Sequence, residues 1–296
     1  MIVAKHVGRG QARWRVLCGI LSLCWVGCFQ SQSYQVGSRY SPFQRFNGPE
    51  GSDVVFVESA LLQTNLGDEA IDQEIWATAD DLVLPPETRA ALKANGLRVA
   101  QVGGIMPAAL MKLLTAPHTC IKAQRHIRRS GGPIELPVAG ERPCVEFVYH
   151  DGTAELPQHY RSARFVVRVV PRCDKQDNIT LEVTPQLFHG ERKLCPEAGP
   201  SGGEWSIVGK QELFSDPRLK CTLTVGLNEY VLIGGYAEEP FTFGGQGFTG
   251  RDGNRAVQWA IALRTGRMPS NQPLQESQAS GIVPLALQAA RPTNRH

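Results

Sequence analysis

Apolar and polar residues alternate most regularly near the middle of the second half of the chain. The apolar positions are Ile179, Leu181 and Val183, and they alternate with the polar residues Thr180, Glu182 and Thr184. A period of two places successive side chains on opposite faces of a strand. We therefore expect a strand here, with one face in a hydrophobic core and the other in contact with water.

Neighbouring segments share this composition. Residues 165–171 (FVVRVVP) and 219–235 (LKCTLTVGLNEYVLIGG) are rich in β-branched and other apolar residues and are bounded by turn-forming residues. Such segments are typical of strands separated by turns. Residues 144–156 fit a hairpin about Asp151-Gly152, a pair that favours a type I′ turn. The turn explains Asp151 and its neighbour His150 without a functional site.

The first part of the body mixes both periodicities. Residues 53–62 predict a strand and residues 97–102 a second, shorter strand. Three helices are predicted around them by helical spacing, by prolines at a helix start and by a glycine at a helix end; they cover residues 67–80, 84–96 and 106–115. Trp76 is predicted as a core anchor of the first helix.

Together these patterns predict an α+β fold. A small α/β unit is expected over residues 51–116, followed by a mostly antiparallel, β-rich domain over residues 117–266. Residues 267–296 hold Pro, Gln, Ser and Asn without a sustained pattern, so a disordered tail is expected there.

The N-terminus predicts export. Residues 1–15 are basic, and the apolar run over residues 16–27 has twelve residues, whereas a membrane-spanning helix needs about 20. This order is typical of a signal peptide, assigned to residues 1–28. The end resembles a bacterial lipobox, with Cys28 as the lipidated residue, although Trp25 stands where leucine is usual. The alternatives are cleavage at another bond and retention as an uncleaved anchor.

Removal of the signal peptide would change the net charge of the protein and therefore the partners expected for it. Residues 29–50 are polar and are assigned as a linker. The formal net charge is +3, but four bases and no acid precede Cys28, so the remainder carries 27 bases and 28 acids, a net charge of −1. This balance argues against nucleic acid as a partner, because such proteins cluster an excess of Lys and Arg.

One basic cluster remains in the exported body. We interpret it as a solvated loop or strand edge, with an anionic partner as the alternative. Its members are Lys122, Arg125, His126, Arg128 and Arg129.

The cysteines leave two interpretations open. Of the eight in the chain, Cys18 and Cys24 lie in the signal peptide, and no CxxC pair or zinc-type Cys/His spacing occurs. The others either form up to two disulfides with one thiol left over or act as small buried hydrophobic residues. Those of the body are Cys120, Cys144, Cys173, Cys195 and Cys221.

Motifs for catalysis are missing from the sequence. There is no GxSxG, HExxH, Walker A or EF-hand pattern. Residues 245–250 (GQGFTG) match GxGxxG, but the dinucleotide fingerprint also needs a strand before it and a βαβ unit around it. We expect a glycine-rich turn between strands at residues 240–243 and 255–264. No catalytic, cofactor-binding or metal-binding residue is assigned, and no enzyme activity is expected.

Three segments carry a family resemblance. They are Val169-Val170-Pro171, the strand over residues 179–185 that ends in proline, and residues 222–235, which finish in Ile-Gly-Gly with Asn228-Glu229 at a turn. This order resembles the core β-domain of bacterial secretins, the outer-membrane pore subunits of type II and type III secretion and of pilus systems. The resemblance implies that residues 222–235 form a strand pair. In layout the chain is similar to short exported lipoproteins of planctomycete-type bacteria.

The chain departs from that family after Gly235. Secretins continue with elements that complete their domain, whereas this chain continues YAEEPFTFGGQGFTG. We therefore expect that it forms no pore, and that Glu238, Glu239 and Pro240 protect a sheet edge.

The sequence thus predicts an exported cell-envelope lipoprotein, in the periplasm or outer membrane, with a structural or protein-interaction role. Expected partners are other envelope or secretion proteins and the membrane, through the lipid at Cys28. One alternative is a subunit of an outer-membrane complex for secretion or pili. Another is a periplasmic binding module or an enzyme without a recognisable motif. The oligomeric state stays open.

Overall fold

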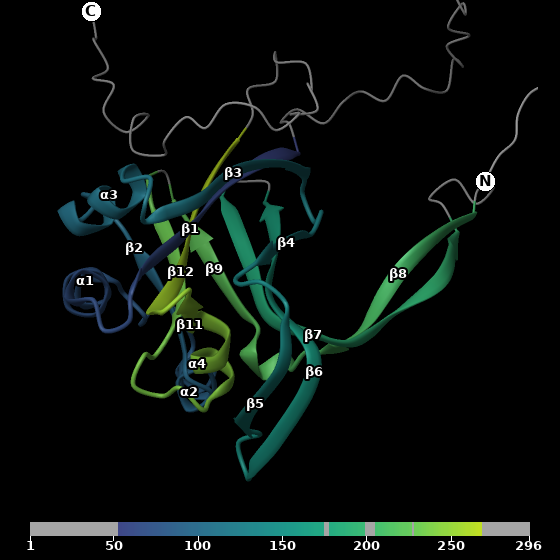
Figure 1. The fold of residues 1–296 in the computed structure, drawn as a ribbon. Coiled ribbons are helices and arrows are strands. Elements are labelled where there is room, and N and C mark those ends of the chain that lie inside the picture. Colours follow the sequence, from purple (N-terminus) through teal and green to yellow (C-terminus); the bar gives the residue numbers. More distant parts are fainter. Residues whose placement is uncertain (1–52, 175–177, 199–204, 227, 268–296) are drawn as a thin grey trace, which may run out of the picture. The chain divides into compact units, whose positions relative to one another are not determined.

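The computed structural model describes residues 53–174, 178–198, 205–226 and 228–267, which form two antiparallel sheets and several short helices (Figure 1). The predicted signal peptide with Cys28, the linker and the tail lie outside the described residues. The α+β class with mostly antiparallel strands is confirmed.

The first sheet joins the beginning and the end of the described chain. Its strands follow the order β2-β10-β12-β1-β3, and β11 pairs with β12. The long pair of β1 and β12 runs from Val55 opposite Arg267 to Asn65 opposite Val257. The strands are β1 (Val54–Asn65), β2 (Leu97–Val102), β3 (Cys120–Arg129), β10 (Tyr230–Gly235), β11 (Thr249–Asp252) and β12 (Arg255–Arg267).

The second sheet is built on two long strands. These are β6 (Glu155–Cys173) and β7 (Ile179–Ala198), which pair with each other near the middle of the sheet. Each long strand has two successive partners on its outer side. For β6 they are β5 (Arg142–His150) and β4 (Ile134–Pro137), and for β7 they are β9 (Cys221–Val225) and β8 (Trp205–Phe214).

The helices are short. The first predicted helix forms as a π-helix, η2 (Ala70–Ile75), followed by one turn, α1 (Trp76–Thr78). The other two predictions are confirmed as α2 (Pro86–Ala94) and α3 (Ala108–Thr115). After α2 the backbone turns at Gly96 with φ +69°, a left-handed conformation that glycine adopts without steric cost. A 3₁₀ turn, η3 (Pro217–Leu219), and α4 (Phe243–Phe248) complete the set.

The inner strands of the first sheet are covered on both faces, whereas the edge strand β3 has no buried residue. One face packs against η2, α1 and α3 in a cluster that includes Trp76, as predicted for this residue. The other face packs against the second sheet. Residues from the first sheet in this sandwich core include Val57, Val99, Ile233 and Ile261, and those from the second include Val167, Leu181, Val183 and Leu223.

The alternation around residue 180 is confirmed. Leu181 and Val183 are buried, whereas Thr180 and Glu182 are partly exposed. The alternation ends there, because Thr184, expected on the wet face, is buried. The boundary expected at residue 116 falls inside one compact unit, because β1 pairs with β12 and β2 pairs with β10. Both predicted regions therefore contribute strands to the same sheet.

The strand pair expected over residues 222–235 is wrong. β9 pairs with β7 in the second sheet, whereas β10 lies between β2 and β12 in the first. All side chains from Tyr230 to Gly234 are buried, and a strand without alternation belongs where both faces are covered. At the crossing the Glu229 carboxylate accepts a hydrogen bond from Gly226 N at 2.5 Å, and Asn228 has φ +66°.

Three local predictions also need correction. The hairpin of β5 and β6 is present, but its loop has four residues, closed by Asp151, which accepts bonds from Thr153 N and Ala154 N. Residues 240–243 form a turn and the start of α4 instead of a strand, since Thr242 caps that helix by accepting a bond from Gly245 N. The residues expected to protect an edge, 238–240, follow β10, which is paired on both sides.

Candidate functional site

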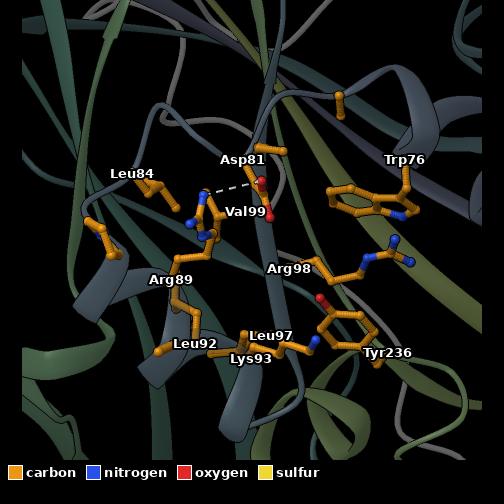
Figure 2. Close-up of a pocket in the computed structure, with 14 residues that line it drawn as sticks. Trp76, Asp81, Leu84, Arg89, Leu92, Lys93, Leu97, Arg98, Val99 and Tyr236 are labelled. Atoms are coloured by element: carbon orange, nitrogen blue, oxygen red, sulfur yellow. Dashed lines mark ion pairs between the residues drawn. The ribbon is translucent and has the colours of Figure 1, made fainter.

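A cavity of about 380 Å³ lies between α2 and β2 (Figure 2). The helix supplies Arg89 and Lys93 from one turn and the next, and the strand supplies Arg98. Trp76 and Tyr236 close the other end, and Leu92 and Leu97 form an apolar floor.

Arg98 is held between two aromatic rings. Its guanidinium carbon lies 4.6 Å from the ring centre of Trp76 and 4.7 Å from that of Tyr236. It also pairs with Asp72 at 3.6 Å. Partial burial raises the pKa of Asp72 above its ordinary value, and burial likewise raises the pKa of the Tyr236 phenol. The rings and the carboxylate fix one cation at the mouth of the cavity.

The cavity carries an excess of positive charge. Arg89 pairs with Asp81 at 3.6 Å, as drawn in Figure 2. Lys93 has no ion pair within the described residues. Three cations and one carboxylate therefore line the cavity, an arrangement that favours an anionic group on a ligand.

A second cavity, of about 510 Å³, lies on the opposite side of α2. The Tyr149 hydroxyl donates to the Asp216 carboxylate, and Arg218 donates to both. The Arg218 bonds lower the pKa of Asp216 to about 2, while burial, together with the neighbouring carboxylate, raises the pKa of Tyr149. This network ties the end of β5 to η3 and presents no nucleophile with a base. His150 lines the cavity, and the Asp151 side chain accepts hydrogen bonds from Thr153 N and Ala154 N in its own loop.

The outer part of β7 and β8 forms a two-stranded ribbon with one apolar face. Figure 1 shows the two strands leaving the second sheet together. In the register, Leu194 is opposite Gly209, and residues two apart along each strand share a face. We call the set on this side the ribbon face: Leu194, Pro196, Ala198, Trp205 and Ile207. Trp205 is 73% exposed and Ile207 is 74% exposed.

The predicted basic cluster lies on β3, the edge strand of the first sheet, which confirms the interpretation as a strand edge. Arg125 pairs with the buried Glu58, and Ser59 bonds His126 at 3.0 Å. Burial, together with Arg128 and Lys122, lowers the pKa of His126 to about 4. Charged side chains on an edge discourage pairing with other strands.

The glycine-rich motif is explained by packing. A β carbon on Gly245 would lie 2.0 Å from the Glu239 carbonyl oxygen, and one on the preceding Gly244, outside the motif, would lie 2.1 Å from that of Gly96. Both positions therefore need glycine, because backbone approaches too closely for a side chain. The match to GxGxxG requires no bound cofactor.

The five described cysteines are all unpaired, so the disulfides considered from the sequence are not formed. Cys221 is buried, as the hydrophobic interpretation expects, and burial raises its pKa to about 12. Cys144 is the exposed one, and its sulfur lies 3.3 Å from His159 Nε2. With Glu146 these residues are the one group of three within the described chain that could hold a metal.

This group is not apparent from spacing along the chain, although the hairpin pattern contains a signal for it. The predicted hairpin fixes which residues of its two strands face each other. With a four-residue loop, Glu146 lies opposite His159, and Cys144 lies two residues from Glu146 on the same face. The three residues have no metal-ligand spacing along the chain, because the pairing of the two strands brings them together.

A scan against protein-family models gave no match, and searches of curated proteins and of solved structures found no significant similarity. The secretin resemblance therefore stays a prediction from the residues that carry it. Across the described part of the chain, each helix is too short or too polar to cross a bilayer.

Proposed function

We propose that this chain is an exported cell-envelope protein with an interaction role, and that it associates with a second copy of itself through the ribbon face. The observation that carries the proposal is the exposure of Trp205, Ile207 and Leu194 side by side on two strands. Large apolar side chains that gather on one surface mark an interaction site. Tryptophan is also enriched among residues that dominate binding energy.

The ribbon has a stable base and an uncovered end. At the base, Phe214 packs against Tyr149 with ring centres 5.1 Å apart and against Phe147 at 6.1 Å. Beyond it, β7 and β8 pair only with each other among the residues that the structure describes, so both outer edges of this ribbon lack a described strand partner. A two-stranded ribbon in water is marginally stable by itself. Association would cover its apolar face and its edges together.

Charge on the ribbon favours a second copy as the partner. The polar side carries the pairs Lys193 with Glu212 at 3.4 Å and Lys210 with Glu197 at 3.6 Å. Equal numbers of acids and bases give no strong field that would select an acidic or basic partner or repel an identical ribbon. A two-fold axis would place the same apolar patch on both sides of the interface.

The test is the mass of the full chain in solution, measured by light scattering during size-exclusion chromatography in mild detergent. We expect a dimer or larger assembly that Ile207→Lys converts to a monomer, because a buried charge would replace an apolar contact. Ser206→Lys is the matched control, since Ser206 is the exposed neighbour on the polar side. A monomeric wild type, or an Ile207→Lys variant that stays assembled, would overturn the proposal.

Export and anchoring rest on the first 28 residues of the sequence. The proposed lipid is carried by Cys28, which would become the N-terminus after cleavage. Metabolic labelling with a radioactive fatty acid should mark the wild type and leave Cys28→Ala unlabelled. Equal labelling of both, or of neither, would contradict a lipid anchor at this residue.

The cavity beside α2 favours a second candidate function, a binding module for a small anionic molecule. Its support is the cationic lining by Arg89, Lys93 and Arg98. Citrate and inorganic phosphate are suitable calorimetric probes of a carboxylate and a phosphate. Binding that Lys93→Ala weakens and that Lys112→Ala, on α3, leaves unchanged would support this candidate; no heat with either probe would count against it.

A further inference from the structure

The outer face of the β5–β6 hairpin brings three different metal-ligating groups together. Cys144 and Glu146 alternate with the buried Val145 and Phe147 on β5, so they point away from the core. His159 on β6 lies directly opposite Glu146 in the register. The three side chains are exposed, and one ligand atom from each lies within 4.8 Å of the others.

The distances suit coordination by one ion. The Cys144 sulfur and His159 Nε2 are 3.3 Å apart. Zinc bonds of about 2.3 Å to sulfur and about 2.0 Å to nitrogen, at a tetrahedral angle, separate these two ligands by roughly 3.5 Å. His159 Nδ1 lies 3.6 Å from a carboxylate oxygen of Glu146, whose side chain is 72% exposed and so has room to change rotamer. One imidazole nitrogen holds the ion, so the Glu146 carboxylate must turn from Nδ1 toward an ion held at Nε2 beside the Cys144 sulfur.

The ligand types decide which metal fits. Thiolate, imidazole and carboxylate together are a donor set for zinc, whereas magnesium and calcium bind through oxygen. Three protein ligands leave one of four tetrahedral positions open, and here that position faces solvent. Water or a donor atom from another molecule would complete the coordination.

The scaffold holds these ligands on paired strands. The register of β5 and β6 continues from Cys144 opposite Arg161 to His150 opposite Glu155. The alternate side chains Val145, Phe147 and Tyr149 are each buried in the sandwich core. Ligands on packed strands keep their spacing better than ligands on loops. The site is also separate from the ribbon face and from the cavity beside α2, since it shares no residue with either.

We propose that Cys144, Glu146 and His159 bind one zinc ion on the outer face of the β5–β6 hairpin. Binding would release the thiol proton of Cys144 to solvent, because the thiolate is the ligand. The exposed position means that the fold does not depend on the ion. The metal would instead add a Lewis-acidic contact point to this surface.

The experiment uses the full chain, free of any histidine tag and kept reduced with a phosphine. Zinc uptake is measured by dialysis and elemental analysis, and cobalt is substituted to report the ligands by absorption. We expect one zinc per chain and a thiolate-to-cobalt charge-transfer band. Cys144→Ala and His159→Ala should each abolish stoichiometric binding. Glu146→Gln removes a proposed ligand, so it should weaken zinc binding by more than the roughly 10- to 100-fold that loss of an outer-shell partner costs.

Cys120→Ala is the control, because it removes a half-buried thiol on β3 that lies outside this group. It should leave zinc uptake and the cobalt spectrum unchanged. Circular dichroism of every variant should match the wild type, since the substituted side chains at the site are exposed. The proposal is overturned if the wild type takes up no stoichiometric zinc, if Cys144→Ala or His159→Ala retains it, or if bound cobalt shows no thiolate band.

Discussion

The inner and outer parts of β7 are two stretches of one strand with different surroundings. The inner part, residues 179–187, pairs with β6 along its length and with β9 at residues 179–183, and it faces the first sheet. The outer part, residues 193–198, has β8 as its neighbour. Leu181 in the inner part is 0% exposed, whereas Leu194 in the outer part is 76% exposed.

Alternation of apolar and polar residues thus predicts a strand and its apolar face, but it does not predict whether another element packs on that face. In both parts apolar residues share one side of the strand. Where a second sheet covers that side, burial stabilises the fold. Where nothing of the described chain covers it, the same pattern leaves a surface for association. Substitutions along the strand should therefore act on stability in one part and on assembly in the other.

The largest effect is expected at Leu181. Leu181→Ala should lower the free energy of unfolding by about 2 to 5 kcal/mol, because it removes fully buried methyl groups and leaves a cavity. Thr180→Ala, one residue earlier and partly exposed, should cost under about 0.5 kcal/mol. Urea titration followed by circular dichroism measures both. Equal losses would break the distinction between the two faces of the inner part.

A smaller loss of unfolding free energy is expected when a side chain is added where α4 packs against the backbone at Gly96. Gly244→Ala should cost about 1 to 3 kcal/mol, since the new β carbon would meet the Gly96 carbonyl oxygen. The control is Gly140→Ala, where no atom lies within 4 Å of the added carbon. Thermal denaturation of the two variants should separate them clearly. If both variants melt at the temperature of the wild type, the backbone around Gly244 and Gly96 can move apart to accept a β carbon, and the packing there is not as close as in the core around Leu181.

On the edge strand β3, titration of His126 should make the free energy of unfolding depend on pH, with an effect of intermediate size. The unfolded chain binds a proton on His126 below about pH 6.5, but the folded chain binds it only near pH 4. Unfolding therefore takes up a proton as pH falls, so stability should decrease between these values and level off below the lower one. The loss should be between about 1 and 2 kcal/mol, reduced from the full pKa difference because the ring is partly exposed.

His126→Gln isolates this contribution. The variant keeps a group that can bond Ser59 but does not titrate, so its unfolding free energy should vary less with pH across the window. Asp216, with its pKa lowered to about 2, affects both proteins equally and acts at lower pH. Identical pH profiles for the two proteins would contradict the neutral, partly buried histidine.

The smallest effect on stability is expected at the ribbon face. Leu194→Ala should change the unfolding free energy of the isolated monomer by under about 0.5 kcal/mol, because the side chain is already in water. Dilution followed by sedimentation velocity should nevertheless show weaker self-association than the wild type. A large loss of monomer stability would mean that the outer part of β7 is covered as the inner part is.

The sequence was most informative where a local rule acts alone. Alternation at Leu181 and Thr180 identified both faces of the strand. Proline and glycine signals placed α2 with little error. The same rules failed at the strand of residues 240–243 and at the strand pair of residues 222–235. There the outcome depended on backbone packing around α4 and on which sheet could bury both faces of β10.

The candidate sites likewise depend on tertiary contacts that local sequence rules do not predict. The exposure of the ribbon face cannot be predicted from its residue types, because Leu194 and Leu181 are the same residue in similar strand patterns, yet one is exposed and the other buried. The zinc ligands are separated by the length of a hairpin, so only the register joins them.

Local patterns in the chain were enough to predict the class of the fold and most strands and helices, and they placed the basic cluster of β3 on a loop or a strand edge. These depend on side-chain periodicity, turn residues and charge, which act over a few neighbouring positions. The tertiary structure alone decided that β1 and β2 join β12 and β10 in one sheet, that β9 and β10 separate, and that part of β7 stays uncovered. Such choices depend on which distant segments bury each other's apolar faces, and a local pattern contains no information about the partner.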